Sequence, residues 1–162
     1  LIAHLQKQRI NRLTLIGSPI LGLTGIGPAN DLIEVPKGIS KTEAVPLYLH
    51  NLRKLMVFKP EAADELALEI HVENMAKARL RSRGIARTSI LAESLKNLPC
   101  SLHCIFGEKD TTLHPDLAGV KKYVEDIHPG ASFYIIEDAG HWVQFEAYEK
   151  VNSILQEILN ED

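Results

Sequence analysis

The sequence predicts an α/β fold in which helices cover a mostly parallel sheet of about three strands. Short apolar runs at residues 12–18, 101–106 and 133–137 are typical of buried strands. The second and third runs are each followed by a segment whose apolar residues recur every three or four positions, as on one face of a helix. Alternating strands and helices imply parallel strands joined by right-handed crossovers.

The N-terminal part contains the first of these strands. Residues 1–8 have the pattern of the end of a helix, and the chain does not begin with Met, so we expect a fragment of a longer protein. The strand at residues 12–18 follows. Several glycines and Pro28 then indicate a loop at the end of that strand.

Residues 41–98 are predicted to be helical, with three or four helices and no strand. Pro46, Pro60 and Gly84 are expected to break the helical pattern. We interpret this segment as a helical layer inserted between the first and second strands. The core of the fold then comprises residues 1–40 and 99–162.

The second half of the chain predicts strand, helix, strand and helix in that order. Pro115 is expected at the first position of a helix that ends at His128-Pro129-Gly130. The strand at residues 133–137 precedes a last amphipathic helix. The expected apolar stripes of the two helices are Leu117, Val120, Val124 and Ile127, and then Tyr148, Val151, Leu155 and Ile158.

Composition excludes several classes of protein. The chain has 162 residues, a net charge of −3 and one short basic stretch at residues 79–87, so we expect no nucleic-acid partner. No apolar run approaches the roughly 20 residues of a membrane-spanning helix, and the first ten residues do not resemble a signal peptide. We therefore expect a cytoplasmic protein with no membrane partner.

The cysteines and histidines predict no metal site and no cofactor. Cys100 and Cys104 bracket a predicted strand, which separates their Cα atoms by about 13 Å, whereas a disulfide needs about 5.5 Å. We expect two reduced core thiols. Five of the six histidines outside the motifs described next show no spacing typical of metal ligands: His50, His71, His103, His114 and His128.

Two motifs place a titratable residue just beyond a predicted strand. Gly107-Glu108-Lys109-Asp110 follows the second strand, and Ala139-Gly140-His141-Trp142 follows the third. Sites in open α/β sheets lie outside the carboxyl ends of the strands, so an orienting Asp110 and a general-base His141 are favoured over a turn aspartate and a loop histidine. Trp142 is a candidate substrate contact, although packing is the more common role of a tryptophan.

Together these motifs and their order resemble the C-terminal half of an α/β-hydrolase, with residues 41–98 in the place of the helical cap. The family's triad runs nucleophile, acid, histidine along the chain, which implies that Asp110 is the acid and His141 the base for a serine hydroxyl. The sequence contains no Gly-x-Ser-x-Gly nucleophile turn. The resemblance therefore implies a nucleophile before residue 1 and a fragment that is inactive alone.

The string Gly-His-Trp-x-Gln-x-Glu, followed by Asn152, is similar to that of meta-cleavage-product hydrolases and of related esterases. The former cut carbon–carbon bonds in vinylogous 1,5-diketone acids. The resemblance implies a small, largely apolar acid or its ester as substrate. It also implies a cap arginine for the substrate carboxylate. Arg79, Arg81 and Arg83 are candidates for it, although solvated surface arginines are more common.

Two other functions remain open at this stage. The parent protein could use an Asp nucleophile, as epoxide hydrolases and dehalogenases do, with His141 activating water. It could also be a non-catalytic interaction module.

The first strand is expected to lack a partner on one side, whichever function applies. It would then leave an open sheet edge, through which we expect self-association.

Overall fold

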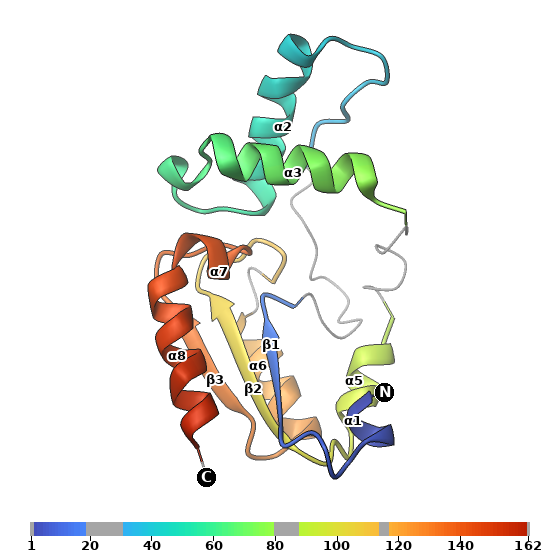
Figure 1. The fold of residues 1–162 in the computed structure, drawn as a ribbon, viewed down its shortest axis with the longest axis vertical. Helices are drawn as coiled ribbons and strands as arrows, with labels where there is room; N and C mark the ends of the chain where they lie inside the picture. Colours follow the sequence, from blue (N-terminus) through green and yellow to red (C-terminus); the bar gives the residue numbers. More distant parts are fainter. Residues whose placement is uncertain (1, 19–30, 80–87, 114–116, 162) are drawn as a thin grey trace.

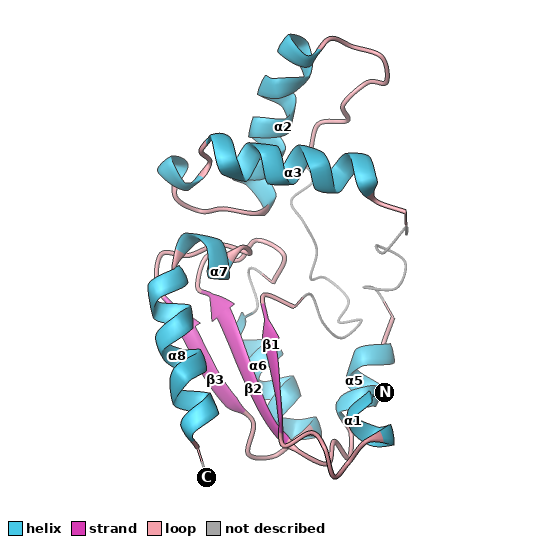
Figure 2. Ribbon diagram, in the orientation of Figure 1, coloured by secondary structure: helices cyan, strands magenta, loops and turns pink. Residues whose placement is uncertain are grey.

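The computed structural model describes residues 2–18, 31–79, 88–113 and 117–161. Its sheet has three parallel strands in the order β1 (Arg12–Ile16), β2 (Ser101–Gly107) and β3 (Ser132–Ile136) (Figure 2). The α/β prediction and the positions of all three predicted strands are confirmed.

Helices lie on both faces of the sheet and beyond its carboxyl end. In Figure 1, α8 lies on one side of the sheet and α6 on the other, while α2 and α3 lie past the arrowheads of the strands. The helical elements are α1 (Ile2–Leu5), α2 (Lys41–Leu55), the 3-10 turn η1 (Pro60–Ala62), α3 (Glu65–Lys77), α5 (Ile90–Leu95), α6 (Leu117–Ile127), α7 (Val143–Glu146) and α8 (Tyr148–Asn160).

The central strand β2 divides two apolar cores because successive side chains point to opposite faces of a strand. Leu102, Cys104 and Phe106 face one core, together with residues of α5 and α6. Ile105 faces the other, together with residues of α7 and α8. Each face of the sheet is thus covered by helices, as parallel sheets require.

The predicted apolar stripes of the two core-covering helices are confirmed except at Tyr148, which is exposed at the start of α8. Val120 and Val124 of α6 are fully buried, and Val151 and Ile158 of α8 are nearly so. Helix α6 ends at Ile127, where the sequence predicts its end. The expectation that Pro115 begins this helix lies outside the described residues.

Helix α2 corrects one prediction. Pro46 lies inside this helix, so the expected break there is wrong. Pro46 removes only one main-chain bond, while Ser40 and Glu43 form a capping box at the N-terminus and Leu52 is buried against α3. These contacts outweigh the cost of the proline. The break at Pro60 is confirmed, since η1 begins there.

The segment between β1 and β2 contributes to two different packing clusters. Leu52 and Val57 belong to a small cluster formed by α2, α3 and the α7 region. Helix α5 instead packs into the core of the sheet through Ala92 and Leu95. The assignment of residues 41–98 to a cap stays a prediction, and the expected break at Gly84 lies outside the described residues. Among the described helices, none is long and apolar enough to cross a bilayer.

Candidate active site

The site lies where the carboxyl ends of the three strands meet. Gly17 follows β1, and its amide N–H donates to the carbonyl of Ile105 in β2 at 2.9 Å. Gly17 has a φ of +51°, and a Cβ placed on it would lie 2.5 Å from the carbonyl oxygen of His141. Only glycine fits this close approach. The end of β1 therefore contacts the loop that follows β3.

Asp110 and His141 form a close pair at this edge. Asp110 Oδ2 lies 3.0 Å from His141 Nδ1. The Asp110 side chain is 1% exposed and the His141 side chain 16% exposed. The carboxylate is thus shielded from water, while part of the imidazole remains accessible. The structure brings together the two residues that the sequence singled out as acid and base.

Thr112 completes the arrangement and was not among the sequence candidates. Its amide N–H and hydroxyl donate to Asp110 Oδ1 at 2.8 and 2.7 Å, and its hydroxyl oxygen lies 3.2 Å from His141 Nδ1. An aspartate that accepts from the amide two residues later is a common turn motif. The Asp-Thr-Thr string is therefore a signal from which this contact could have been predicted.

These contacts determine which ring nitrogen of neutral His141 bears the proton. An ionised Asp110 only accepts hydrogen bonds, so the Thr112 hydroxyl donates to it and can only accept from His141. Nδ1 then has to be the protonated nitrogen, because both of its neighbours are acceptors. Nε2 is left as the basic nitrogen, which is the state required of a general base.

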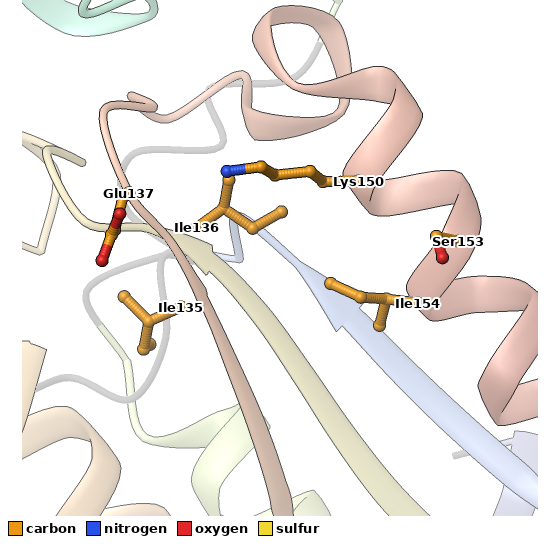
Figure 3. Close-up of a pocket in the computed structure, with 6 residues that line it drawn as sticks. All are labelled: Ile135, Ile136, Glu137, Lys150, Ser153 and Ile154. Atoms are coloured by element: carbon orange, nitrogen blue, oxygen red, sulfur yellow. The ribbon is translucent and has the colours of Figure 1, made fainter.

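One cavity borders this region and another lies away from it. A cavity of about 60 Å³ is lined by residues from the end of α2 and the loop after it, including Phe58, and by residues of the loops after β2 and β3, including Lys109 and His141. A larger cavity of about 310 Å³ lies between β3 and α8, and Figure 3 shows the residues that line it. Neither Asp110 nor His141 lines the larger cavity.

Trp142 packs beneath the helical layer. Its ring makes edge contacts with His71 and Phe145 at centroid distances of 6.2 and 6.1 Å. Its amide N–H donates to the carbonyl of Met56 at 2.7 Å. These are packing contacts, and a role in substrate binding stays a prediction.

The candidate arginines are only partly described. Arg79 is exposed just beyond the end of α3, and Arg81 and Arg83 lie outside the described residues. Within the described ranges, no three histidine, cysteine, aspartate or glutamate side chains converge as a metal would require. Cys100 and Cys104 are both free thiols.

Comparison with solved structures identifies the architecture. The chain superposes on a meta-cleavage product hydrolase from Pseudomonas fluorescens with a TM-score of 0.66 and 16% identity, covering 98% of this chain and 58% of that one. The match spans the C-terminal part of such proteins. The fold is part of an α/β-hydrolase fold.

Two further solved structures have the same fold. A 2-hydroxy-6-oxo-6-phenylhexa-2,4-dienoate hydrolase from Rhodococcus matches with a TM-score of 0.60 and 18% identity, over 99% of this chain and 59% of that one. A serine hydrolase involved in carbazole degradation gives 0.58 and 16%, over 98% and 57%. The chain thus spans less than two thirds of each. No protein-family model matches the sequence, and a search of curated proteins finds no significant match.

Proposed function

We propose that this chain contributes the acid and the general base of a serine-type α/β-hydrolase. The observation that supports this function best is the 3.0 Å contact between buried Asp110 and partly accessible His141 at the carboxyl ends of the strands. In the proposed reaction, the sequence supplies two of three triad members. The nucleophile comes from residues outside this sequence, because no Gly-x-Ser-x-Gly turn occurs within it.

The proposed mechanism assigns one task to each residue. His141 Nε2 removes the proton from a serine hydroxyl as that oxygen attacks the substrate carbonyl, and later returns it to the leaving group. Asp110 holds the Nδ1 proton in place and stabilises the imidazolium that forms. General-base catalysis of this kind contributes roughly 10²- to 10⁴-fold in rate.

The proposed substrate is a small, largely apolar acid that is cut at a carbon–carbon bond, or an ester of such an acid. The names of the similar structures support this class, since they include a meta-cleavage product hydrolase and a phenylhexadienoate hydrolase. Among the three candidate arginines, Arg79 is the one that the structure describes, and its exposed side chain is our candidate for contact with a substrate carboxylate.

The test joins the chain to its upstream reading frame and measures hydrolysis of p-nitrophenyl esters and of a vinylogous 1,5-diketone acid. We expect turnover to fall by at least about 10³-fold in both Asp110→Asn and His141→Ala, because triad members act as a unit. Lys122→Ala serves as the control, since this lysine is exposed on α6. Turnover retained in both site variants would overturn the proposal. Turnover of epoxides or haloalkanes in place of esters would indicate an Asp nucleophile.

A further inference from the structure

The carboxylate of Glu146 joins two loops that are far apart in the sequence. Glu146 is the last residue of α7 and is half-buried. Its Oε1 accepts the amide N–H groups of Phe58 and Lys59 at 2.8 and 2.7 Å, and its Oε2 accepts the amide N–H of Gly140 at 2.5 Å. Phe58 and Lys59 follow α2, whereas Gly140 immediately precedes His141.

The two loops also touch directly through their main chains. A Cβ placed on Gly140 would lie 2.8 Å from the amide nitrogen of Phe58 and 3.0 Å from the carbonyl oxygen of Met56. That same carbonyl accepts the amide N–H of Trp142 at 2.7 Å. The residues on both sides of His141 are therefore bonded, directly or through Glu146, to residues 56–59.

The acid-bearing loop is tied to the same region. The Thr111 hydroxyl donates to the carbonyl of Lys54 at 3.0 Å, at the end of α2. The loops that bear Asp110 and His141 are thus both tied to residues 54–59, at the end of α2 and just after it. Neither loop is held by the strands alone.

We propose that Glu146 is a positioning residue, whose carboxylate fixes the His141 loop to residues 56–59. The role as a positioning residue rests on the proposed function, in which His141 is the general base. The physical reason is charge: an ionised carboxylate forms shorter and stronger bonds to main-chain N–H groups than a neutral acceptor does. A displacement of residues 56–59 is expected to reach His141 through this side chain, in addition to the direct bond from the Trp142 amide to the Met56 carbonyl.

The first test replaces the carboxylate with an amide of the same size. In Glu146→Gln only one oxygen can accept, so the side chain cannot keep its bonds to both loops. Glu149→Gln makes the same change of charge at an exposed position on α8 and is the matched control. We expect hydrogen exchange of the amides of Phe58, Lys59 and Gly140, measured by NMR, to rise about tenfold or more in Glu146→Gln and to stay unchanged in Glu149→Gln.

A second variant removes one donor and leaves Glu146 intact. Lys59 has a φ of −74°, which proline adopts, so Lys59→Pro deletes its N–H and places the ring Cδ against Glu146 Oε1, which displaces the carboxylate. We expect exchange of the Gly140 amide to rise, although Gly140 lies on the other side of the carboxylate. In both variants the nitrogen-15 chemical shifts of the His141 ring should move away from those of the unmodified chain.

Either of two results would overturn the proposal. One is a set of unchanged nitrogen-15 shifts of the His141 ring in a folded Glu146→Gln variant. The other is an unchanged Gly140 amide in Lys59→Pro, which also decides the matter where Glu146→Gln fails to fold. These readouts need no turnover, so they are independent of the hydrolysis assay, and failure of the positioning role is distinguishable from failure of the proposed function.

Discussion

Asp110 Oδ2 lies 3.0 Å from His141 Nδ1, although 31 positions separate the two residues along the chain. The parallel pairing of β2 with β3 explains their meeting. Both strands run in the same direction, so the loops that follow them emerge at the same edge of the sheet. Between β2 and β3, helix α6 returns the chain to the amino ends of the strands. The contact between these two residues is thus a product of the sheet topology.

The tautomer of His141 is a direct test of this pair. In the unmodified chain we expect neutral His141 to carry its proton on Nδ1, because Asp110 and Thr112 both accept there. In Asp110→Asn the new amide can donate to Nδ1, which favours the proton on Nε2. Nitrogen-15 chemical shifts of the labelled ring distinguish the two forms. Identical ring spectra in the two proteins would contradict the assigned geometry.

Thr112→Val tests the support beneath Asp110. Valine keeps the shape of the side chain but removes the hydroxyl that donates to Asp110 Oδ1 at 2.7 Å, leaving the amide of residue 112 as the donor there. We expect the free energy of unfolding, measured with urea, to fall by about 1–3 kcal/mol, since a buried carboxylate loses a partner. Thr112→Ser keeps the hydroxyl and serves as control. Equal losses in the two variants would show that packing, and not the hydrogen bond, is responsible.

The strands and the acid–histidine pair could be predicted because their signals are local. Each strand is a continuous apolar run, and Asp110 and His141 directly follow two of them. The contacts of Glu146, and that of Thr112 with His141, depend on which loops meet in space, which the spacing of residues does not reveal. Pro46 misled the prediction because intrinsic propensity is weak against a good cap and tertiary packing.

Alanine substitutions at two glycines with left-handed backbone distinguish the cost of backbone strain from the cost of a steric clash. Gly17 has a φ of +51° and a Cβ position 2.5 Å from the carbonyl oxygen of His141, whereas Gly38 has a φ of +81° and nothing within 4 Å. We expect Gly38→Ala to lower the free energy of unfolding by about 1 kcal/mol and Gly17→Ala to lower it by clearly more. Thermal or urea unfolding measures both. Equal losses would mean that the contact between Gly17 and His141 is not tight.

Burial of His71 predicts a loss of stability in mild acid. The ring is 5% exposed, and its removal from water lowers the pKa of His71 below its ordinary value of 6.5. Above about pH 6.5 His71 is neutral in both the folded and the unfolded chain, so the protein keeps its full stability there. As the pH falls below that value, the unfolded chain takes up the proton first, so stability falls until the folded pKa is reached.

The measurement for His71 is the free energy of unfolding in urea between pH 7.5 and 5. We expect His71→Leu to reduce the slope of the free energy of unfolding against pH by up to about 1.4 kcal/mol per pH unit, which is the limit for uptake of one proton. His128→Leu, which removes a half-buried histidine near the end of α6, controls for the loss of any one histidine. An unchanged slope in His71→Leu would rule out His71 as the source.

The open edge of β1 predicts self-association of the isolated chain. In the described part of the chain β1 pairs only with β2, and all five of its residues are half-buried. Gly17 donates toward β2 and Asn11 accepts from it, so the alternation of a parallel ladder directs the main-chain groups of Thr14 away from β2. Thr14→Pro therefore removes an outward N–H and leaves the ladder with β2 complete. We expect concentration-dependent association in light scattering that weakens in Thr14→Pro and persists in Thr14→Val. A monomer at every concentration, or equal association of both variants, would show that this edge is not the contact.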